Sequence, residues 1–408
     1  LMSWFCVTYG QNTYILKSPD NKITMTIDIG DEISYSVKHD NTLIIKNSPI
    51  SMELIDGKIL GKGNVVKKLK RNAVEETITA DFYKKKEVKN NYNELIIRFK
   101  DNYSLTFRAF DDGVAYRFST SFKKPIIIKK ENVNYVFDED YTAYIPYVNA
   151  RRGEGDFLVQ QFFTSFESQY TVEPISKMDT ERIAFTPLLV CLKDSKKVVI
   201  VESDLEDYPG TFFRKGEGSS LPAVQATYPK TEEQGGHNML QLVVKERESF
   251  IAKVAGTRDF PWRAMIISEN DAELMNSDMV YKLASPSRVA DVSWIKPGKV
   301  AWDWWNDWNI WGVDFEAGIN NDTYKYYIDF ASEHGIEYVI LDEGWAVNKQ
   351  ADLFQVVPEI DLEELVSYAD EKNVGLVLWA GYYAIDRDME HVCQHYSEIG
   401  RASCRERV

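Results

Sequence analysis

The chain has 408 residues, of which 44% are apolar and 27% charged, so a disordered chain is excluded and two or three domains are expected. Its 48 Lys and Arg residues against 63 Asp and Glu residues give a net charge of −15. This acidic balance argues against a nucleic-acid or anionic-membrane binder and fits neutral or cationic ligands. No stretch approaches 18 apolar residues, so no membrane span is expected. The oligomeric state cannot be read from the sequence.

Residues 1–17 are expected to be a lead-in segment. The first ten, LMSWFCVTYG, fit equally the tail of a secretory signal peptide and an ordinary first strand. The four cysteines show neither the spacing of a disulfide framework nor that of a zinc site.

From about residue 21 to residue 290, short runs alternate apolar and polar side chains, which is typical of antiparallel strands. Such runs occupy residues 22–28, 33–37, 94–99, 104–110, 114–119, 187–192, 197–202 and 239–244. Asp111-Asp112-Gly113 between two of them predicts a hairpin turn. This half of the chain therefore predicts a large β-sandwich.

From about residue 299 the pattern changes to strands that alternate with helices. Strands are expected at 299–303, 336–341 and 374–379, and helices at 322–334, 361–372 and 387–397. Apolar strands joined through helices indicate a parallel sheet with right-handed crossovers. No nucleotide-binding glycine motif follows any strand.

Polar and aromatic residues instead follow each of these strands. Five Trp residues fall between positions 302 and 311, and acidic or aromatic residues follow the next two strands. In a (β/α)₈ barrel all these strand ends open into one active-site mouth. Indole faces suit the C–H faces of sugar rings, although a Trp cluster also serves as a core.

Long motifs now give a resemblance to a known family. PGKVAWDWWNDWNIWGVD at 297–314, YKYYIDFASEHGIEYVILDEGW at 324–345, PEIDLEEL at 358–365 and VLWAGYYAIDRDM at 377–389 resemble glycoside hydrolase family 97. FRAFDDGVAYRF at 107–118 and the Trp262-Arg263 element resemble the N-terminal domain of that family. The similarity spans about residues 18–397.

The resemblance implies a multidomain β plus α/β fold. Residues 18–296 are expected to form an N-terminal β-supersandwich, and residues 297–397 the first three units of a (β/α)₈ catalytic barrel. Family members are Ca²⁺-dependent, exo-acting α-glycosidases, chiefly α-glucosidases and α-galactosidases. A complete barrel takes about 250 residues, so the nucleophile and the general acid are expected downstream of Ser397. Residues 1–408 alone are therefore expected to be inactive.

Candidate site residues follow from the same resemblance. Glu167, in FESQYT at 166–171, is the candidate Ca²⁺ ligand, against the alternative of a solvated loop residue. Residues expected to contact an oligosaccharide or α-glycoside substrate lie at the strand ends: Asp303, Trp304, Asn306, Asp342, Glu343, Trp345 and Trp379. A structural cap is the alternative for Asp303. Trp345 and Trp379 fit equally a sugar platform and a wedge between domains.

Residues 398–408, EIGRASCRERV, resemble a translated sequencing-adapter read-through and are expected to be an artefactual tail; a natural basic tail is the alternative. The functional prediction is a retaining enzyme, α-galactosidase rather than α-glucosidase, exported to a bacterial periplasm or secreted. The alternatives are an inverting α-glucosidase of the same family and a non-catalytic carbohydrate-binding protein.

Overall fold

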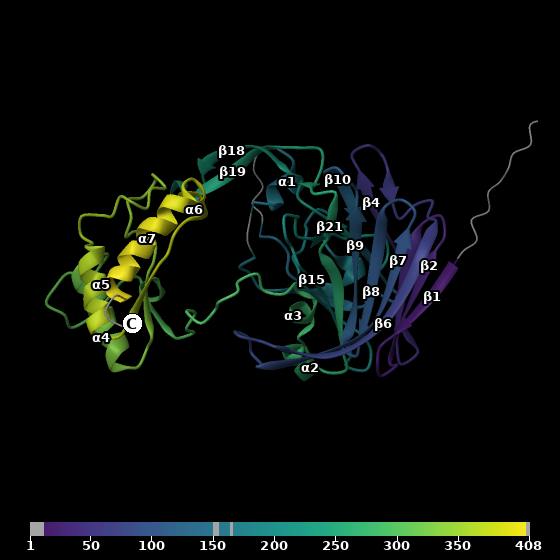
Figure 1. Cartoon of the computed structure of the whole chain (residues 1–408), viewed down its shortest axis with the longest axis horizontal. Coiled ribbons are helices and arrows are strands. Elements are labelled where there is room, and N and C mark those ends of the chain that lie inside the picture. Colours follow the sequence, from purple (N-terminus) through teal and green to yellow (C-terminus); the bar gives the residue numbers. More distant parts are fainter. Residues whose placement is uncertain (1–11, 150–154, 164–165, 405–408) are drawn as a thin grey trace, which may run out of the picture. The chain divides into compact units, whose positions relative to one another are not determined.

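The structure, a computed structural model, describes residues 12–149, 155–163 and 166–404 (Figure 1). Contacts divide the chain into two compact units. The first unit comprises Leu1–Tyr228 and Glu248–Ala290, and the second comprises Pro229–Arg247 and Asp291–Val408. The sequence placed a single boundary between residues 296 and 297. It gave no sign that residues 229–247 belong with the second half.

Two ten-stranded antiparallel sheets make up the first unit. One sheet contains β1 (Asn12–Lys17), β2 (Ile23–Ile29), β3 (Ile33–His39), β4 (Thr42–Leu54), β5 (Ile59–Leu60), β10 (Ile126–Asn132), β11 (Asn134–Phe137), β16 (Phe212–Phe213), β17 (Ser220–Val224) and β20 (Ala252–Val254). The other contains β6 (Val66–Thr79), β7 (Glu87–Phe99), β8 (Tyr103–Phe110), β9 (Gly113–Ser121), β12 (Thr142–Ile145), β13 (Thr171–Pro174), β14 (Leu188–Cys191), β15 (Lys197–Ser203), β21 (Thr257–Asp259) and β22 (Trp262–Ser268). The main hydrophobic core takes buried side chains from both sheets, which confirms the predicted β-sandwich.

Alternation in the sequence places one face of each strand in this core. In β2, every second residue from Ile23 to Ile29 is buried. The predicted turn also forms, because Phe110 pairs with Gly113 and leaves Asp111 and Asp112 as the loop. At Gly113, φ is +151°, and an added Cβ would lie 2.1 Å from the carbonyl oxygen of Met265, so only glycine fits there.

The second unit contains a three-stranded parallel sheet with strands in the order β23 (Val300–Trp302), β24 (Tyr338–Leu341) and β25 (Gly375–Leu378). Helix α4 (Asn321–Glu333) follows β23, and α5 (Leu362–Glu371) follows β24 (Figure 1). The Asn320 side chain caps α4 through the amide of Thr323, and Asp361 caps α5 through the amide of Glu364. These strands and helices lie within one or two residues of the predicted boundaries.

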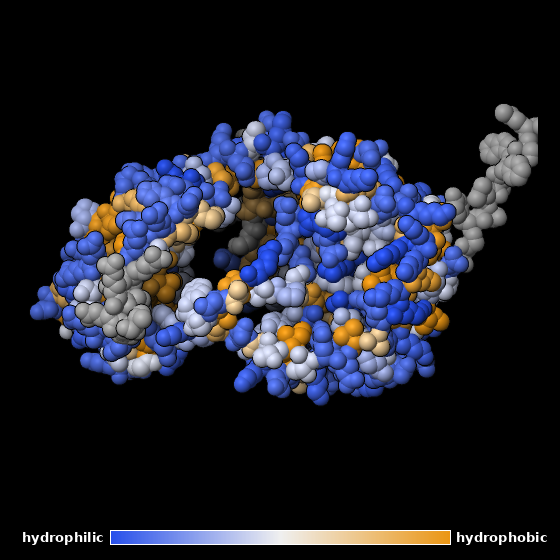
Figure 2. Space-filling model, in the orientation of Figure 1, coloured by the Kyte–Doolittle hydropathy of each residue, from blue (hydrophilic) through white to orange (hydrophobic). Residues whose placement is uncertain are grey.

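A separate antiparallel hairpin, β18 (Pro229–Gly235) and β19 (Gln241–Arg247), completes the second unit. The remaining helical segments are α1 (Phe157–Gln161), η1 (Ile175–Lys177), η2 (His237–Met239), α2 (Asp271–Asn276), α3 (Met279–Leu283), η3 (Asp303–Asn306), α6 (Tyr382–Asp386) and α7 (Met389–Cys404). None of the described helices combines the length and apolar composition that crossing a bilayer requires. On the face drawn in Figure 2, both units show mainly hydrophilic residues with scattered hydrophobic ones.

Both predicted terminal segments are partly described. Of the lead-in, residues 12–17 form β1 and pair with β2, whereas residues 1–11 lie outside the described part. Of the predicted tail, residues 398–404 continue α7, and residues 405–408 lie outside it.

A buried ion pair links the two sheets of the first unit. Arg263 on β22 contacts Glu131 on β10 at 2.6 Å and Glu202 on β15 at 2.5 Å, and both Arg263 and Glu131 are 2% exposed. Burial by itself would lower the pKa of the Arg263 guanidinium, but the two carboxylates raise it above its ordinary value. Removing Glu131 would leave Arg263 with Glu202 as its one carboxylate partner and would remove the two hydrogen bonds that its Nε and a terminal nitrogen donate to Glu131.

We therefore expect Glu131→Ala to lower the free energy of unfolding by about 3–5 kcal/mol, the usual cost of breaking a buried pair. Denaturation of the full chain in urea, with hydrogen exchange at β10 and β22 amides to localise the change, measures the effect.

Glu53→Ala is the matched control, because Glu53 forms a more exposed pair with Lys129 at 2.7 Å. That pair should contribute about 1 kcal/mol or less. Equal losses from both variants would contradict the role assigned to Glu131.

Candidate functional site

Asp303 lies where β23 ends and η3 begins, and its carboxylate joins three elements. It accepts hydrogen bonds from the Tyr324 hydroxyl on α4 (2.6 Å), the Trp308 indole N–H (3.0 Å), and the amides of Trp304 (2.6 Å) and Asp342 (3.3 Å). The residue is 0% exposed. This arrangement favours the structural cap, and contact with a sugar hydroxyl stays a prediction that the geometry does not favour.

Asp342 and Glu343 follow β24 directly and differ in environment. Asp342 is 7% exposed and accepts hydrogen bonds from the Trp302 indole N–H and the Glu343 amide. The Glu343 side chain is 18% exposed and faces the η2 turn. Of the two, Glu343 is thus the more accessible carboxylate for a substrate.

Three indoles form an exposed stacked surface beside Asp303. Ring centroids of Trp302 and Trp304 lie 5.4 Å apart, and those of Trp302 and Trp305 lie 5.8 Å apart. Trp304 is 51% exposed and Trp305 is 77% exposed. Asn306, also exposed, donates to the Asn309 carbonyl and accepts from the Tyr327 hydroxyl. Exposed apolar faces of this kind can stack on sugar rings.

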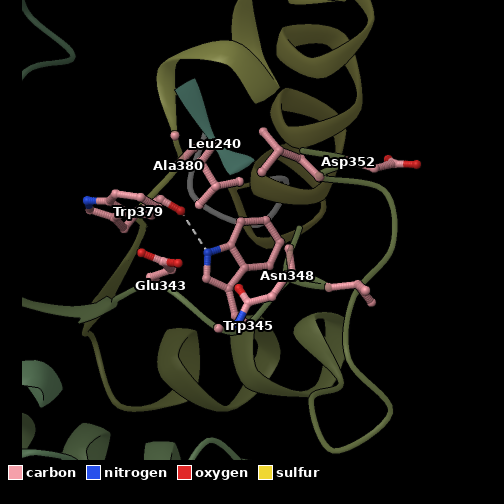
Figure 3. A pocket seen from close by; sticks show the side chains of 12 residues that line it. Leu240, Glu343, Trp345, Asn348, Asp352, Trp379 and Ala380 are labelled. Carbon is pink, nitrogen blue, oxygen red and sulfur yellow. Dashed lines mark hydrogen bonds between the residues drawn. The ribbon is translucent and has the colours of Figure 1, made fainter. Parts of the chain in front are cut away.

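The pocket around Trp345 and Trp379 is closed to a sugar. Trp345 is 2% exposed and donates from its indole N–H to the Trp379 carbonyl at 2.8 Å (Figure 3). The cavity that these residues line measures about 20 Å³, room for about one water molecule. Trp345 thus serves as a core residue of the second unit and not as a sugar platform or a wedge between domains. Trp379 is half-buried.

The η2 turn at the tip of the β18–β19 hairpin contributes residues that the sequence did not indicate. Asn238 donates from its amide to Glu343, and His237 Nε2 lies 3.6 Å from the same carboxylate. The Asn238 carbonyl accepts from the Lys349 amide at 3.1 Å, and Leu240 lines the pocket of Figure 3. No spacing signal could reveal this contact, because it joins residues 105 positions apart.

Glu167, the predicted Ca²⁺ ligand, lies in the first unit and is exposed. Ca²⁺ needs six to eight oxygen ligands, and in the described part of the chain only His39, Asp40 and Glu269 bring three donors together. Lys196 and Lys22 already pair with that group, at 3.2 Å from Asp40 and 2.8 Å from Glu269. The described residues therefore do not by themselves form a Ca²⁺ site.

The comparisons with known proteins agree with one another. A family model described as "Glycosyl-hydrolase 97 N-terminal" matches residues 16–286, and one described as "Glycoside hydrolase 97" matches residues 304–406. A retaining alpha-galactosidase of Bacteroides thetaiotaomicron is 52% identical over 391 residues, covering 96% of this chain and 59% of that protein. A probable retaining alpha-galactosidase of Streptomyces bingchenggensis is 25% identical over 363 residues, covering 87% of this chain and 50% of that protein.

Solved structures show the same fold. A family 97 enzyme from Pseudoalteromonas sp. strain K8, in complex with acarbose, superposes with a TM-score of 0.72 at 24% identity, covering 89% of this chain and 53% of that one. A beta-arabinopyranosidase gives a TM-score of 0.70 at 20% identity, covering 91% and 56%. The chain thus spans 50–59% of the length of the two curated relatives named above.

The Asp303 network predicts a pH effect. Burial raises the pKa of Asp303 above its ordinary value of 3.8, and the hydrogen bond from Tyr324 partly offsets this. The protonated form of Asp303 therefore stabilises the second unit. Its contribution to the free energy of unfolding is complete below the ordinary pKa of 3.8 and is lost as the pH rises through the higher pKa of the folded state. Tyr324→Phe should raise that pKa further, extend the decline to higher pH and cost about 1–3 kcal/mol. Thermal melts between about pH 3 and pH 7 measure the decline.

Tyr326→Phe is the control, because Tyr326 lies exposed on the same helix. An unchanged pH profile in Tyr324→Phe would show that the hydroxyl does not support the carboxylate.

The hairpin contact makes a separate prediction. Asn238→Asp places a second carboxylate against Glu343 and should detach the η2 turn, because like charges at this distance repel. Hydrogen exchange at the Lys349 amide should then accelerate at least tenfold. Asn309→Asp, at an exposed position of the same unit, should leave that amide unchanged. Equal exchange rates in the two variants would disprove the anchoring role of Asn238.

Proposed function

Because this chain belongs to glycoside hydrolase family 97, we propose that the protein containing it is a retaining α-galactosidase that releases terminal α-linked galactose. The observation that carries this proposal is 52% identity to a retaining alpha-galactosidase across 96% of the chain. A fold similar to family 97 structures supports the same assignment.

The proposal extends to the architecture of the second unit. Three parallel strands in sequential order, with a helix after each, fit the first three units of a (β/α)₈ barrel. In that arrangement Asp303, Asp342 and the exposed indoles would lie at the mouth where such barrels bind substrate.

Retaining hydrolysis needs two carboxyl groups about 5–5.5 Å apart, one as nucleophile and one as general acid. Asp303 and Asp342 already accept hydrogen bonds from the protein, so they are poor candidates for that pair. We propose that the catalytic carboxylates belong to protein sequence beyond these residues. The indoles of Trp304 and Trp305 would stack on sugar rings, and Glu343 would accept a sugar hydroxyl.

Calcium dependence is part of the proposal. Glu167 is exposed and offers one carboxylate ligand, and the remaining ligands would come from outside the described residues. Calcium would supply positive charge near the reacting sugar. Export to the periplasm or the medium is the matching localisation, carried by the family resemblance.

The test is hydrolysis by the complete gene product of p-nitrophenyl α-galactoside and α-glucoside, with and without a calcium chelator. We expect the galactoside to be cleaved at least tenfold faster, with retention at the anomeric carbon, and activity to fall on chelation and return with Ca²⁺. Glu167→Gln should raise the Ca²⁺ concentration needed for half-maximal activity.

A preference for the glucoside with inversion would favour the inverting α-glucosidase instead. Sugar binding without cleavage would favour a carbohydrate-binding protein, for which the exposed indoles are the supporting observation.

A further inference from the structure

The outer face of the β22–β9–β8–β7 sheet carries a stack of cationic and aromatic side chains. Arg263 points into the main core, so its neighbour Trp262 points to the opposite face of β22. The guanidinium carbon of Arg108 lies 4.3 Å from the Tyr92 ring centroid and 4.7 Å from that of Trp262. That of Arg117 lies 4.4 Å from Trp262. The result is a four-layer stack of Tyr92, Arg108, Trp262 and Arg117.

This stack lines a cavity of about 650 Å³ within the first unit. Strands β6 and β7 supply one part of its wall, and α3 with residues 284–287 another. A second cavity of about 270 Å³ shares Arg117, Asp204 and Ser285 with it. The larger volume is in the range of pockets that bind small ligands.

Two buried polar atoms at this cavity have no hydrogen-bond partner among the described residues. Asn90 is 4% exposed; its amide nitrogen donates to Glu76 at 2.6 Å, but its Oδ1 accepts nothing. Arg117 Nε is likewise unpaired, although its terminal nitrogen contacts Asp259 at 3.1 Å. Buried polar atoms are almost always satisfied, so an acceptor and a donor here point to a bound polar molecule.

The cationic side chains around the cavity are already paired. Arg108 pairs with Glu94 at 2.9 Å, and Lys282 pairs with Asp112 at 2.7 Å. An anion would therefore find no unpaired cation, and the three cationic side chains that line the cavity, Arg108, Arg117 and Lys282, disfavour a cation although Glu76 and Asp81 also line it. A neutral ligand with both donor and acceptor groups fits better.

One wall of the cavity is aromatic. Tyr281 lines it and is stacked on Tyr83, with ring centroids 4.1 Å apart and an angle of 17° between the planes. A half-buried ring of this kind can pack against the C–H face of a sugar, while hydroxyl groups bond to amide and guanidinium groups.

We propose that this cavity is a second, non-catalytic sugar-binding site, in which Asn90 and Arg117 bond to hydroxyl groups and Tyr281 packs on the ring. The choice of an α-galactoside as its ligand rests on the proposed function; the site itself rests on the first unit alone. Such a site would hold a galactoside chain on the enzyme independently of hydrolysis.

The experiment is titration of the full 408-residue chain with melibiose, an α-linked galactose disaccharide, by calorimetry and saturation-transfer NMR. We expect saturable binding that Asn90→Leu weakens at least tenfold, because leucine has a similar size but lacks the unpaired acceptor. Tyr281→Ala should weaken binding similarly. Circular dichroism melts check that both variants remain folded, and Tyr281→Ala tests the proposal if Asn90→Leu does not fold.

Tyr144→Ala is the matched control, because Tyr144 is an exposed aromatic residue of the first unit that lines neither cavity. It should change the affinity less than twofold. Absence of saturable binding by the unaltered chain overturns the proposal, and so does binding that Asn90→Leu weakens no more than Tyr144→Ala does. Hydrolysis by the complete gene product is measured separately, so failure of the catalytic assignment and failure of this site are distinguishable.

Discussion

The buried pair between Arg263 and Glu131 is the interaction on which the first unit depends. It joins a strand of one sheet to a strand of the other across a core that is otherwise almost entirely apolar. An uncompensated guanidinium in that core would be very unfavourable, so the burial of Arg263 favours the register of β22 that brings it to Glu131 and Glu202. Because neighbouring residues point to opposite faces, the same register presents Trp262 to the stack of arginines on the outer face.

Asp303 has the corresponding role in the second unit. Four donors, from η3, the segment after it, α4 and the end of β24, converge on one carboxylate, so the ends of two strands and the first helix are fixed relative to each other. Its pKa is raised by burial, yet every hydrogen bond it receives favours the ionised form. The exposed indoles of Trp304 and Trp305 follow directly in sequence, and their position depends on this anchored turn.

The sequence predicted the regular elements well because local patterns determine them. Alternation defined β2, β8 and β9, and a side-chain cap and apolar spacing defined α4 and α5. It could not predict contacts between distant segments. Asn238 reaches Glu343 from a hairpin that precedes the parallel sheet in the chain. Trp345, which the sequence fits equally to a sugar platform and to a wedge between domains, packs into the core of the second unit. Residue type alone does not tell a buried indole from an exposed one.

Several carboxylates of this chain already accept hydrogen bonds from, or pair with cations of, the protein itself. Those of Asp303, Asp342, Glu131 and Glu202 accept hydrogen bonds or pair with cations inside the protein, so each is held in one orientation and poorly available to transfer a proton or attack a sugar. At the strand ends of the second unit, the accessible groups are the indoles of Trp304 and Trp305, the amide of Asn306 and, in part, the carboxylate of Glu343, which suit recognition of neutral hydroxylated rings. The strand ends of the second unit thus offer a surface for a sugar, and bond-breaking chemistry requires carboxyl groups that these structural contacts do not already occupy.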